Sequence, residues 1–347
     1  MARETRVALV GCGFFAQNHL NGWKDLEAAG ARLVAVCDVD PVKARAACAA
    51  FGVPAFVSLQ DMLDTVKPDL VDVTTRMNTH VEICVELARR GIAAIVQKPL
   101  APTWEDCMAI AGAAREHGSF LAVHENFRYQ APLVEVKRQI DAGLIGTPSW
   151  ARLCFRTGYD VYANQPYFYT EDRLAIQDVG IHVIDIARVF LGEVEWVSCE
   201  TQRRNTKVKA EDTATLMMRH QSGAVSVIEA TYESRRTPDL FPHTRVEIEG
   251  DKGTLLLHSD DEMLFSTKTS LTPLAIFNPA AGWVQKPWHV VQRSVVETNR
   301  AILKALRAGK KSATDIEDNL KTCAIVEAAY AAAAERRARR PGDFLNS

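Results

Sequence analysis

Three side chains in this sequence have the types and settings that proton transfer requires. Asp178 and His182 stand four residues apart in the run IQDVGIHVIDIARVFLG (176–192), a spacing that places them one turn apart on one face of a helix. Lys98 follows an apolar run and precedes Pro99, so its backbone is fixed where the run ends. An imidazole can accept a proton, and a fixed ammonium group can stabilise a developing negative charge on oxygen.

The histidine and its carboxylate neighbour also have a purely structural interpretation. Apolar residues in the same segment predict a buried helix face, and an imidazole beside a carboxylate can be a satisfied pair in a core. Asp185, three residues beyond His182, could orient the imidazole or pair with Arg188, so we assign it no chemical role. The pair becomes a catalytic candidate because the rest of the chain predicts a fold that binds a dinucleotide.

The first half of the chain predicts a parallel sheet covered by helices on both faces. Short apolar runs alternate there with stretches of helical period, which indicates a parallel sheet. Right-handed crossovers make this sheet doubly wound. The expected strands are 6–10, 33–37, 70–74, 92–96 and 119–123, and the expected helices are 17–29, 41–51, 58–65, 80–90 and 103–117.

A G-x-G-x-x-A pattern lies between the first expected strand and the first expected helix. In this setting Gly11 permits a tight turn, Gly13 lets a pyrophosphate approach the backbone, and Ala16 allows close helix–strand packing. The phosphates would lie at the helix N-terminus. We therefore expect a dinucleotide to contact this turn, at Gly11, Gly13, Phe14, Phe15 and Ala16, although a glycine turn without a ligand is the alternative.

A carboxylate follows the second expected strand, at Asp38, and Asp40 adds another nearby. A carboxylate in this place can accept hydrogen bonds from the adenosine ribose hydroxyls and repels a 2′-phosphate. The sequence therefore predicts NAD rather than NADP. Asp38 could instead cap the helix that starts at Pro41, a role that Asp40 could fill equally well.

From about residue 148 the pattern changes to strands with a period of two, several of them joined by short turns. An antiparallel sheet with one face packed on helices is the simplest arrangement. The strands are expected within 149–158, 193–204, 212–220, 223–233, 244–250, 253–259 and 262–268, and the helices at 131–142, 177–191, 289–308 and 315–336. The predicted fold class is α/β, with a Rossmann domain at 1–127 and an α+β domain with a large open, mostly antiparallel sheet at 128–347.

The composition excludes several classes of protein. The 347 residues include 24% charged and 47% hydrophobic residues, with a formal net charge of -2. This balance gives no reason to expect nucleic acid as a partner, and no apolar run approaches the roughly 18 residues of a membrane span. Eight cysteines without a CxxC pair are typical of reduced thiols rather than of a disulfide framework or a metal site. Glycines interrupt the N-terminal apolar run, so we expect no secretory signal and a cytoplasmic location.

These motifs together resemble the Gfo/Idh/MocA family of oxidoreductases, which includes glucose–fructose oxidoreductase and inositol dehydrogenase. The resemblance covers almost the whole chain. It rests on the glycine turn, the D-x3-H pair, an E-K-P motif read here as Gln97-Lys98-Pro99, and a late G-x-x-G-T-L hairpin at 250–255. Four motifs in the family's order are more specific than any one of them.

The sequence departs from the family pattern at two places. In the family's T-P-N-x-x-H segment, Thr75 and His80 match, whereas Arg76 and Met77 replace the proline and the asparagine. Gln97 replaces the usual glutamate, which puts the role of that position in doubt. The resemblance implies cofactor contacts from these motifs, at Thr75, His80, Gln97 and Lys98.

The resemblance also implies a role for each reactive side chain. Lys98 would face the nicotinamide and hydrogen-bond a substrate hydroxyl, and His182 would accept the proton of that hydroxyl as general base. Asp178 would bind a neighbouring hydroxyl or orient the imidazole. The implied reaction transfers a hydride from a substrate carbon to NAD, and no metal is expected.

Polar and aromatic segments of the second half suit a small polyhydroxylated substrate. The candidates are HENFRY (124–129), FRTGYDVYANQPYFY (155–169) and PWHVVQR (287–293). The tyrosine-rich segment could instead be a surface loop or a subunit contact. The expected substrate contacts are Lys98, Asn126, Arg156, Tyr159, Asp160, Gln165, Asp178, His182 and Trp288.

Within the family, GCGFFAQNHL (11–20) together with FRTGYDV (155–161) and NQPYF (164–168) looks similar to sugar dehydrogenases of the D-apiose type. We therefore expect oxidation of a small aldose at its anomeric carbon to a lactone. Oxidation of an inositol ring hydroxyl to a ketone is the alternative reaction, and a sugar sensor that binds NAD without chemistry is the alternative class. The retained Lys98, Asp178 and His182 argue against the sensor. The uncovered face of the second sheet predicts a homo-oligomer, a dimer or a tetramer.

Overall fold

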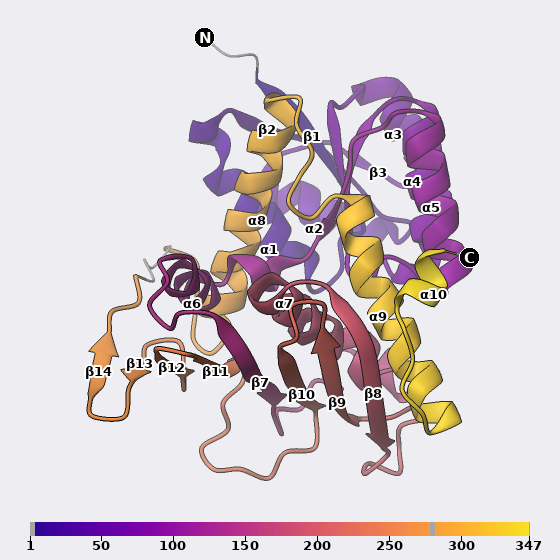
Figure 1. Cartoon of the computed structure of the whole chain (residues 1–347). Helices are drawn as coiled ribbons and strands as arrows, with labels where there is room; N and C mark the ends of the chain where they lie inside the picture. Colours follow the sequence, from indigo (N-terminus) through magenta and orange to yellow (C-terminus); the bar gives the residue numbers. More distant parts are fainter. Residues whose placement is uncertain (1–3, 278–281, 347) are drawn as a thin grey trace. The chain divides into compact units, whose positions relative to one another are not determined.

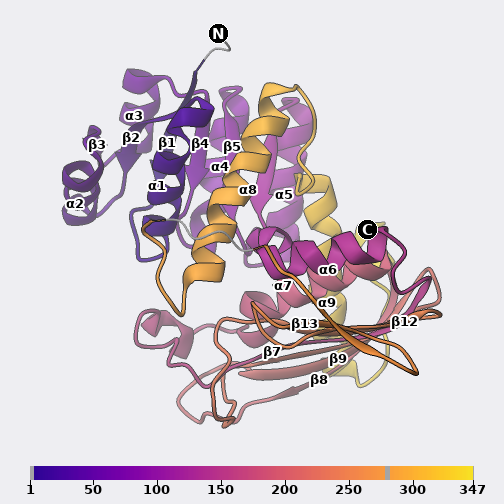
Figure 2. The same ribbon diagram turned by 90° about the vertical axis from the view of Figure 1, so that its left-hand side faces the viewer.

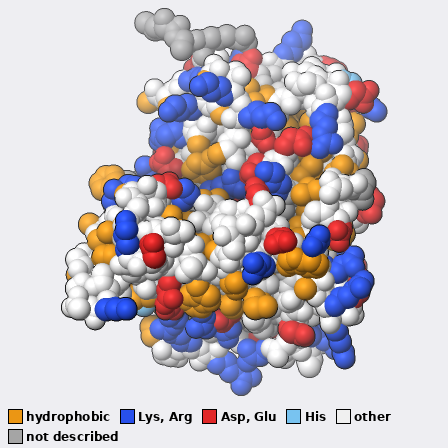
Figure 3. All heavy atoms as spheres, in the orientation of Figure 1, with side chains coloured by type: hydrophobic (Ala, Val, Ile, Leu, Met, Phe, Trp, Pro, Cys, Tyr) orange, Lys and Arg blue, Asp and Glu red, His pale blue; other side chains and the backbone are white. Residues whose placement is uncertain are grey.

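The computed structural model describes residues 4–277 and 282–346, which form two compact units (Figure 1). Unit 1 comprises the described residues up to Asn126 together with Val295–Leu320, and unit 2 comprises Phe127–Ser294 and the described residues from Lys321 onward. Among the described residues, no helix is both long and apolar enough to cross a membrane. Figure 3 shows basic and acidic side chains beside one another over much of the visible surface, as the small net charge leads one to expect.

Unit 1 is built around a parallel sheet of six strands in the order β3-β2-β1-β4-β5-β6. Figures 1 and 2 show α1 and α8 on one face of this sheet and α4 and α5 on the other. The strands are β1 (Thr5–Val10), β2 (Ala31–Cys37), β3 (Ala55–Phe56), β4 (Leu70–Val73), β5 (Ala93–Gln97) and β6 (Leu121–His124). The helices between them are α1 (Ala16–Asp25), α2 (Pro41–Phe51), α3 (Leu59–Val66), α4 (His80–Arg89) and α5 (Trp104–Glu116).

The apolar composition of the strands explains why helices pack on both faces of this sheet. Every residue of β4 and of β5 is buried, which is the pattern of a sheet with helices on both faces. The predicted doubly wound sheet is therefore confirmed. The two-residue strand β3 was not predicted because it is too short to show a period, and the first helix ends at Asp25 and continues as a 3-10 turn at Glu27–Ala29.

The division into units departs from the predicted boundary in one segment. Residues 295–320 belong with unit 1, although the sequence placed them in the second domain. This segment holds the larger part of α8 (His289–Arg307) and the start of α9 (Ile316–Glu335). The Val123 amide donates to the Thr314 carbonyl at 2.8 Å, so the segment extends the hydrogen bonding of β6. Amphipathic periodicity predicts a buried helix face but does not tell which sheet the face covers.

Unit 2 contains an eight-stranded sheet in the order β14-β13-β12-β11-β7-β10-β9-β8. All neighbours are antiparallel except β10 and β7, which run parallel. The strands are β7 (Pro148–Arg156), β8 (Val194–Gln202), β9 (Thr213–His220), β10 (Val225–Thr231), β11 (Arg245–Gly250), β12 (Gly253–Leu257), β13 (Met263–Ser266) and β14 (Leu271–Leu274). The helices are α6 (Ala131–Asp141), α7 (Ile181–Leu191), the remaining parts of α8 and α9, and α10 (Gly342–Leu345).

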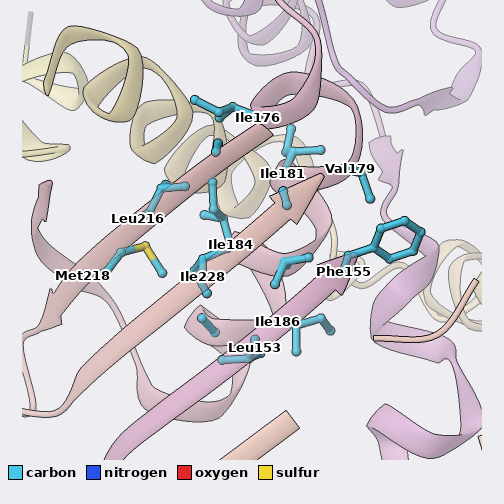
Figure 4. Close-up of a cluster of buried hydrophobic side chains, with 14 of the residues drawn as sticks. Leu153, Phe155, Ile176, Val179, Ile181, Ile184, Ile186, Leu216, Met218 and Ile228 are labelled. Atoms are coloured by element: carbon cyan, nitrogen blue, oxygen red, sulfur yellow. The ribbon is translucent and has the colours of Figure 1, made fainter. Parts of the chain in front are cut away.

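The core of unit 2 lies between this sheet and its helices. Figure 2 shows α6 and α7 on the same side of the sheet, and Figure 4 shows strand side chains meeting those of α7. The labelled core residues are Leu153 and Phe155 of β7, Leu216 and Met218 of β9, Ile228 of β10, and Ile176, Val179, Ile181, Ile184 and Ile186 of the helical segment. Truncating one of these large side chains to alanine costs about 2–5 kcal/mol, so this packing fixes the position of α7 on the sheet.

The outer side of the same sheet carries the alternate residues of each strand. On β9 the burial alternates, and Met217, which points outward between buried neighbours, is 56% exposed. Trp150 and Val227 also belong to this outer set, together with charged residues such as Arg152. The predicted open sheet with one helix-covered face is therefore confirmed.

Candidate active site

The glycine turn after β1 has the shape that a dinucleotide requires. Gly11 has φ +94°, and a Cβ there would lie 2.7 Å from the Thr75 amide nitrogen, so a side chain is excluded on two grounds. A Cβ added at Gly13 would meet nothing within 4 Å. The backbone at Gly13 is thus open to an approaching group, as the binding of a pyrophosphate demands.

The N-terminus of α1 follows this turn. Phe15 is its N-cap and makes no side-chain capping hydrogen bond, and in the first turn the Gln17 and Asn18 amides donate to the backbone carbonyls of Phe14 and Phe15 at 3.4 and 3.0 Å. Ala16 is buried against the sheet, while Phe14 is 52% exposed. An uncapped helix start behind an open glycine fits an anionic phosphate.

The Asp38 carboxylate connects the glycine turn to the end of β2. Its Oδ2 accepts from the Cys12 amide at 2.7 Å, and its Oδ1 accepts from the Asp40 amide at 2.8 Å. Asp40 itself caps α2 by accepting from the Val42 amide at 2.9 Å. Asp40 thus fills the capping role, and Asp38, whose oxygens can each accept a second hydrogen bond, remains available to ribose hydroxyls.

His80 lies inside unit 1 rather than at its surface. Its exposed fraction is 1%, its Nδ1 lies 3.0 Å from the Leu100 carbonyl oxygen, and its Nε2 lies 3.2 Å from the Thr75 carbonyl oxygen. Burial lowers the pKa of His80, which favours a neutral ring that donates to one of these carbonyls at a time. In this position the ring links the Thr75 loop to the loop that follows Lys98. Thr75 is half-buried and accepts from the Thr79 hydroxyl at 2.8 Å.

Lys98 stands between two fixed points of the backbone. Its amide donates to Gln97 Oε1 at 2.8 Å, and Leu100, two residues on, is held by His80. The Lys98–Pro99 peptide bond is cis. The Gln97 side chain is 8% exposed, and its Nε2 lies 2.9 Å from His19 Nε2. Its amide group therefore faces the interior of unit 1.

In unit 2 the segment with the D-x3-H pair is not one regular α-helix. Ile176–Gly180 forms a π-helical turn that contains Asp178, and α7 begins at Ile181. A Cβ at Gly180 would lie 3.0 Å from the Ala175 carbonyl oxygen, which is tighter than an ordinary contact. Single π turns of this kind occur often at functional sites. Apolar spacing predicted the helix at 177–191 but could not show this turn.

Two aromatic residues hold the Asp178 and His182 side chains, and the sequence did not reveal either of them. The Tyr232 hydroxyl, at the end of β10, donates to Asp178 Oδ2. Burial raises the pKa of Tyr232 well above its ordinary value, and the Asp178 carboxylate raises it further, so the phenol remains a donor. His182 is 4% exposed and stacks on Phe127, with ring centroids 3.9 Å apart and planes inclined by 2°. Both aromatic residues are adjacent to their partners only in the folded chain.

Asp185 has a structural role in α7. It is fully buried, and its carboxylate accepts from the Arg128 guanidinium at 2.5 and 2.7 Å and from the Thr322 hydroxyl at 2.7 Å. Arg188 Nη1 lies 3.5 Å from the same carboxylate. Burial opposes the charged form of Asp185, but the two arginines outweigh it and lower its pKa. This network fixes the helix that carries His182.

Two of the expected substrate residues lie together in unit 2. Tyr159 stacks on Phe241 at 4.3 Å between ring centroids, and Trp288 meets both rings edge-on, at 5.8 Å from Tyr159 and 4.6 Å from Phe241. Phe241 was not predicted. Aromatic faces of this kind can pack against the C–H side of a sugar.

The other expected substrate residues have separate settings. Asn126 is buried, Gln165 Oε1 accepts from the Tyr167 hydroxyl at 2.6 Å, and Asp160 Oδ1 accepts from the Ala163 amide at 3.1 Å. Arg156 belongs to the outer set of β7 and pairs with Glu229 at 2.9 Å. It lines a cavity of about 340 Å³ on that outer side, whereas Phe155 points into the core with α7. The structure therefore does not bring Arg156 together with His182.

His, Cys, Asp and Glu side chains are the usual ligands of a metal ion, and cysteine thiols can also form disulfides. Within 4–277 and 282–346, no group of three or more His, Cys, Asp or Glu side chains could hold a metal ion. All eight cysteines are outside disulfides, and all but Cys48 are buried.

Comparison with known proteins places both units in one family. Residues 5–125 match the oxidoreductase family with an NAD-binding Rossmann fold, Gfo/Idh/MocA, and residues 133–256 match the Gfo/Idh/MocA C-terminal domain. The chain is 40% identical over 336 residues to a D-apiose dehydrogenase of Paraburkholderia graminis, covering 96% of this chain and 89% of that protein. It is 36% identical over 343 residues to a D-apiose dehydrogenase of Rhizobium rhizogenes, covering 99% of each.

A solved structure agrees with these matches. An oxidoreductase of Agrobacterium radiobacter, crystallised with NAD+, L-tartaric acid and magnesium, superposes with a TM-score of 0.95 at 36% identity, covering 98% of this chain and 99% of that one. An inositol 2-dehydrogenase of Saccharopolyspora erythraea is 31% identical over 258 residues, which is 73% of this chain and 72% of that protein. The expected family, fold class and cofactor are thereby confirmed.

Proposed function

The chain belongs to the Gfo/Idh/MocA family of NAD-binding oxidoreductases, and we propose that it oxidises a small sugar at a CH–OH carbon. We propose D-apiose as the first substrate to test, oxidised at its anomeric carbon to the lactone. The similarity to D-apiose dehydrogenases along almost the entire chain carries this choice. When bound, NAD+ supplies the hydride acceptor.

In this proposal the cofactor is held by the groups described in unit 1. The open backbone at Gly13 and the uncapped start of α1 receive the pyrophosphate, and Asp38 accepts from the adenosine ribose. The Asp38 carboxylate also repels a 2′-phosphate, which favours NAD over NADP. His80 and Gln97 act from the interior by holding the loops around Lys98 and Thr75.

Three side chains would perform the proton chemistry. His182 removes the proton of the substrate hydroxyl, a step that typically contributes about 10²–10⁴-fold to the rate. Lys98 donates a hydrogen bond to the same oxygen and stabilises the negative charge that develops on it as the proton is removed, before hydride loss from the carbon forms the carbonyl group. Asp178, held by Tyr232, accepts a hydrogen bond from a neighbouring hydroxyl.

Most of the remaining substrate contacts would come from unit 2. The Tyr159–Phe241–Trp288 cluster offers aromatic surface to the C–H face of a sugar ring, and Asp160 and Gln165 offer polar groups. Asn126, which belongs to unit 1, offers a further amide. We omit Arg156, because it lies on the outer side of the sheet and pairs with Glu229.

The test follows nicotinamide absorbance with NAD+ and a panel of aldoses, inositols and hexuronates, and NMR identifies the product. The proposal expects the highest kcat/KM with D-apiose, with a lactone as product. Turnover of an inositol to a ketone would support the alternative reaction. Calorimetric binding of NAD+ and a sugar without turnover would instead support a non-catalytic sensor.

We also propose a cytoplasmic homo-oligomer, a dimer or tetramer, that associates through the outer side of the unit 2 sheet. The support is the apolar part of this surface, which includes the 56% exposed Met217. Light scattering at micromolar concentration should give a multiple of the 38.4 kDa chain mass. A monomer mass would refute the proposal, and Met217→Glu should weaken the association if the surface is correctly chosen.

A further inference from the structure

A chain of buried polar side chains leads from β4 to the backbone of Lys98. Asp72 of β4 and His19 of α1 are both 0% exposed, and Gln97 at the end of β5 is 8% exposed. His19 Nδ1 lies 2.8 Å from Asp72 Oδ2, His19 Nε2 lies 2.9 Å from Gln97 Nε2, and Gln97 Oε1 accepts from the Lys98 amide at 2.8 Å. All of these residues belong to unit 1.

The hydrogen bonds allow one arrangement of protons along this chain. The Lys98 amide can only donate, so the Gln97 atom that faces it is the carbonyl oxygen. The Gln97 NH2 group therefore faces His19, and His19 Nε2 must accept. The ring proton of the neutral imidazole is then on Nδ1, from which it is donated to Asp72. Each assignment follows from the one before it.

The groups around His19 are consistent with this arrangement. Trp23 Nε1 donates to the same Asp72 oxygen at 2.6 Å, so Asp72 serves as an acceptor. The ring of His124 lies 4.2 Å from that of His19, and burial lowers the pKa of His124 to about 3, so it adds no charge near neutral pH.

We propose that His19 and Asp72 are positioning residues that fix Lys98 through Gln97, and that the amide at position 97 keeps this chain in a single protonation state. The inference rests on the proposed role of Lys98. It assigns Gln97, where the family usually has glutamate, a function that the family pattern leaves open. Together with the His80 contact to Leu100, it holds the Lys98 backbone from both sides.

A glutamate at position 97 would require a different protonation state. Both of its carboxylate oxygens accept, so the oxygen facing His19 would need a proton on Nε2, while Nδ1 still donates to Asp72. His19 would then be an imidazolium between two carboxylates, which favour the charged ring. This ring can lose its proton as the pH rises, whereas in the wild type it has no second acceptor for a proton. With glutamine at position 97, the hydrogen-bonded chain that ends at the Lys98 amide does not require a protonated His19.

The first experiment reads the protonation of His19 directly, in the whole protein with histidines labelled with ¹⁵N. Long-range ¹H–¹⁵N NMR distinguishes the two neutral tautomers from the imidazolium, and a His19→Gln variant assigns the signal. We expect the wild-type ring at pH 7 to carry its proton on Nδ1, which faces Asp72, while Nε2 accepts from the Gln97 amide group. In Gln97→Glu we expect an imidazolium at pH 7. A wild-type imidazolium, a proton on Nε2, or a neutral ring in Gln97→Glu would each overturn the inference.

The second experiment measures positioning by kinetics and needs no His19 variant. Gln97→Met keeps the size of the side chain but removes both hydrogen bonds, so kcat should fall on the order of tenfold to a hundredfold, while the NAD+ Kd and the sugar KM change by less than about threefold. Gln97→Glu should recover part of this loss at pH 7 and lose it again at high pH. A matched control is Gln130→Met, which replaces another buried glutamine, 2% exposed and in unit 2, and should show no such pH dependence.

The outcomes separate this inference from the proposed function. If Lys98→Ala keeps full turnover, the proposed catalytic role of Lys98 is refuted. The NMR experiment still tests the proton arrangement on His19 independently of that result. If Lys98→Ala loses turnover while Gln97→Met keeps the wild-type kcat, the proposed function survives and the positioning role is refuted. Equal losses in Gln97→Met and Gln130→Met, tracking only a lower melting temperature, would also refute it.

Discussion

Replacing Asp38 tests how the structure selects its cofactor. Asp38 Oδ2 accepts from the Cys12 amide of the glycine turn at 2.7 Å, and a second acceptor position remains for a ribose hydroxyl. Losing a hydrogen bond to a charged group costs about 1.5–3 kcal/mol, so Asp38→Ala should raise the NAD+ Kd by about 10- to 150-fold. NADP+ binding should suffer less, because the same change removes the repulsion of the 2′-phosphate.

The assay is calorimetric titration of both cofactors into wild type and variants. The wild type should bind NAD+ at least about tenfold more tightly than NADP+. Asp38→Asn separates the two effects, since its amide oxygen still accepts from Cys12 while the charge is gone, and it should mainly improve NADP+ binding. Asp40→Ala is the matched control: it loses the α2 cap to Val42, at a cost of about 0.5–2 kcal/mol in stability, without changing the preference. Equal wild-type affinities, or the same shift in Asp40→Ala, would refute the reasoning.

Three further predictions concern unit 2 and the proton chemistry. Lys98→Ala and His182→Ala should each lower kcat on the order of 10²-fold or more, and the combined loss should be less than additive. The wild-type rate should rise with pH through an apparent pKa that His182→Ala removes. If His182→Ala keeps full turnover and only melts at a lower temperature, His182 is a core residue. Tyr232→Phe should lower kcat/KM by about tenfold or more through the lost hydrogen bond to Asp178, and an unchanged value in steady-state kinetics would make that contact purely structural. Asp185→Asn should destabilise the protein by about 3–5 kcal/mol near pH 7. Because the folded-state pKa of Asp185 is lowered, its contribution is present above the ordinary value of 3.8 and is lost as the pH falls through the folded-state pKa, so calorimetry should show a steeper acid loss in the wild type than in the variant.

Much of the fold could be predicted because its signals are local. Buried strands of unit 1 are continuous apolar runs, strands of unit 2 alternate, and the capping side chains of Asp40, Ser58 and Thr103 mark helix starts. The π turn at Asp178 and the return of 295–320 to unit 1 could not be predicted, because both depend on packing between distant segments. The glycine turn was also predictable from the sequence, because the absence of side chains at Gly11 and Gly13 is what permits the tight turn and the approach of a pyrophosphate to the backbone.

The candidate site was predictable only in part, and Asp72 shows where a signal was overlooked. A single carboxylate in the apolar run LVDVT must have a partner if the strand is buried, since an unpaired buried charge is too costly. In the folded chain that partner is His19, which in turn contacts Gln97. The partners of Asp178 and His182, Tyr232 and Phe127, gave no comparable signal, because an aromatic residue at the end of a strand or loop has many ordinary explanations.

Burial disfavours the charged form of several side chains around the reactive groups. Burial lowers the pKa of His124 to about 3 and also lowers that of His80, and it raises the pKa of Tyr232 well above its ordinary value. His80 and Tyr232 are thus favoured as neutral side chains that donate one hydrogen bond each. A pH dependence of turnover that is lost in His182→Ala would identify the base directly.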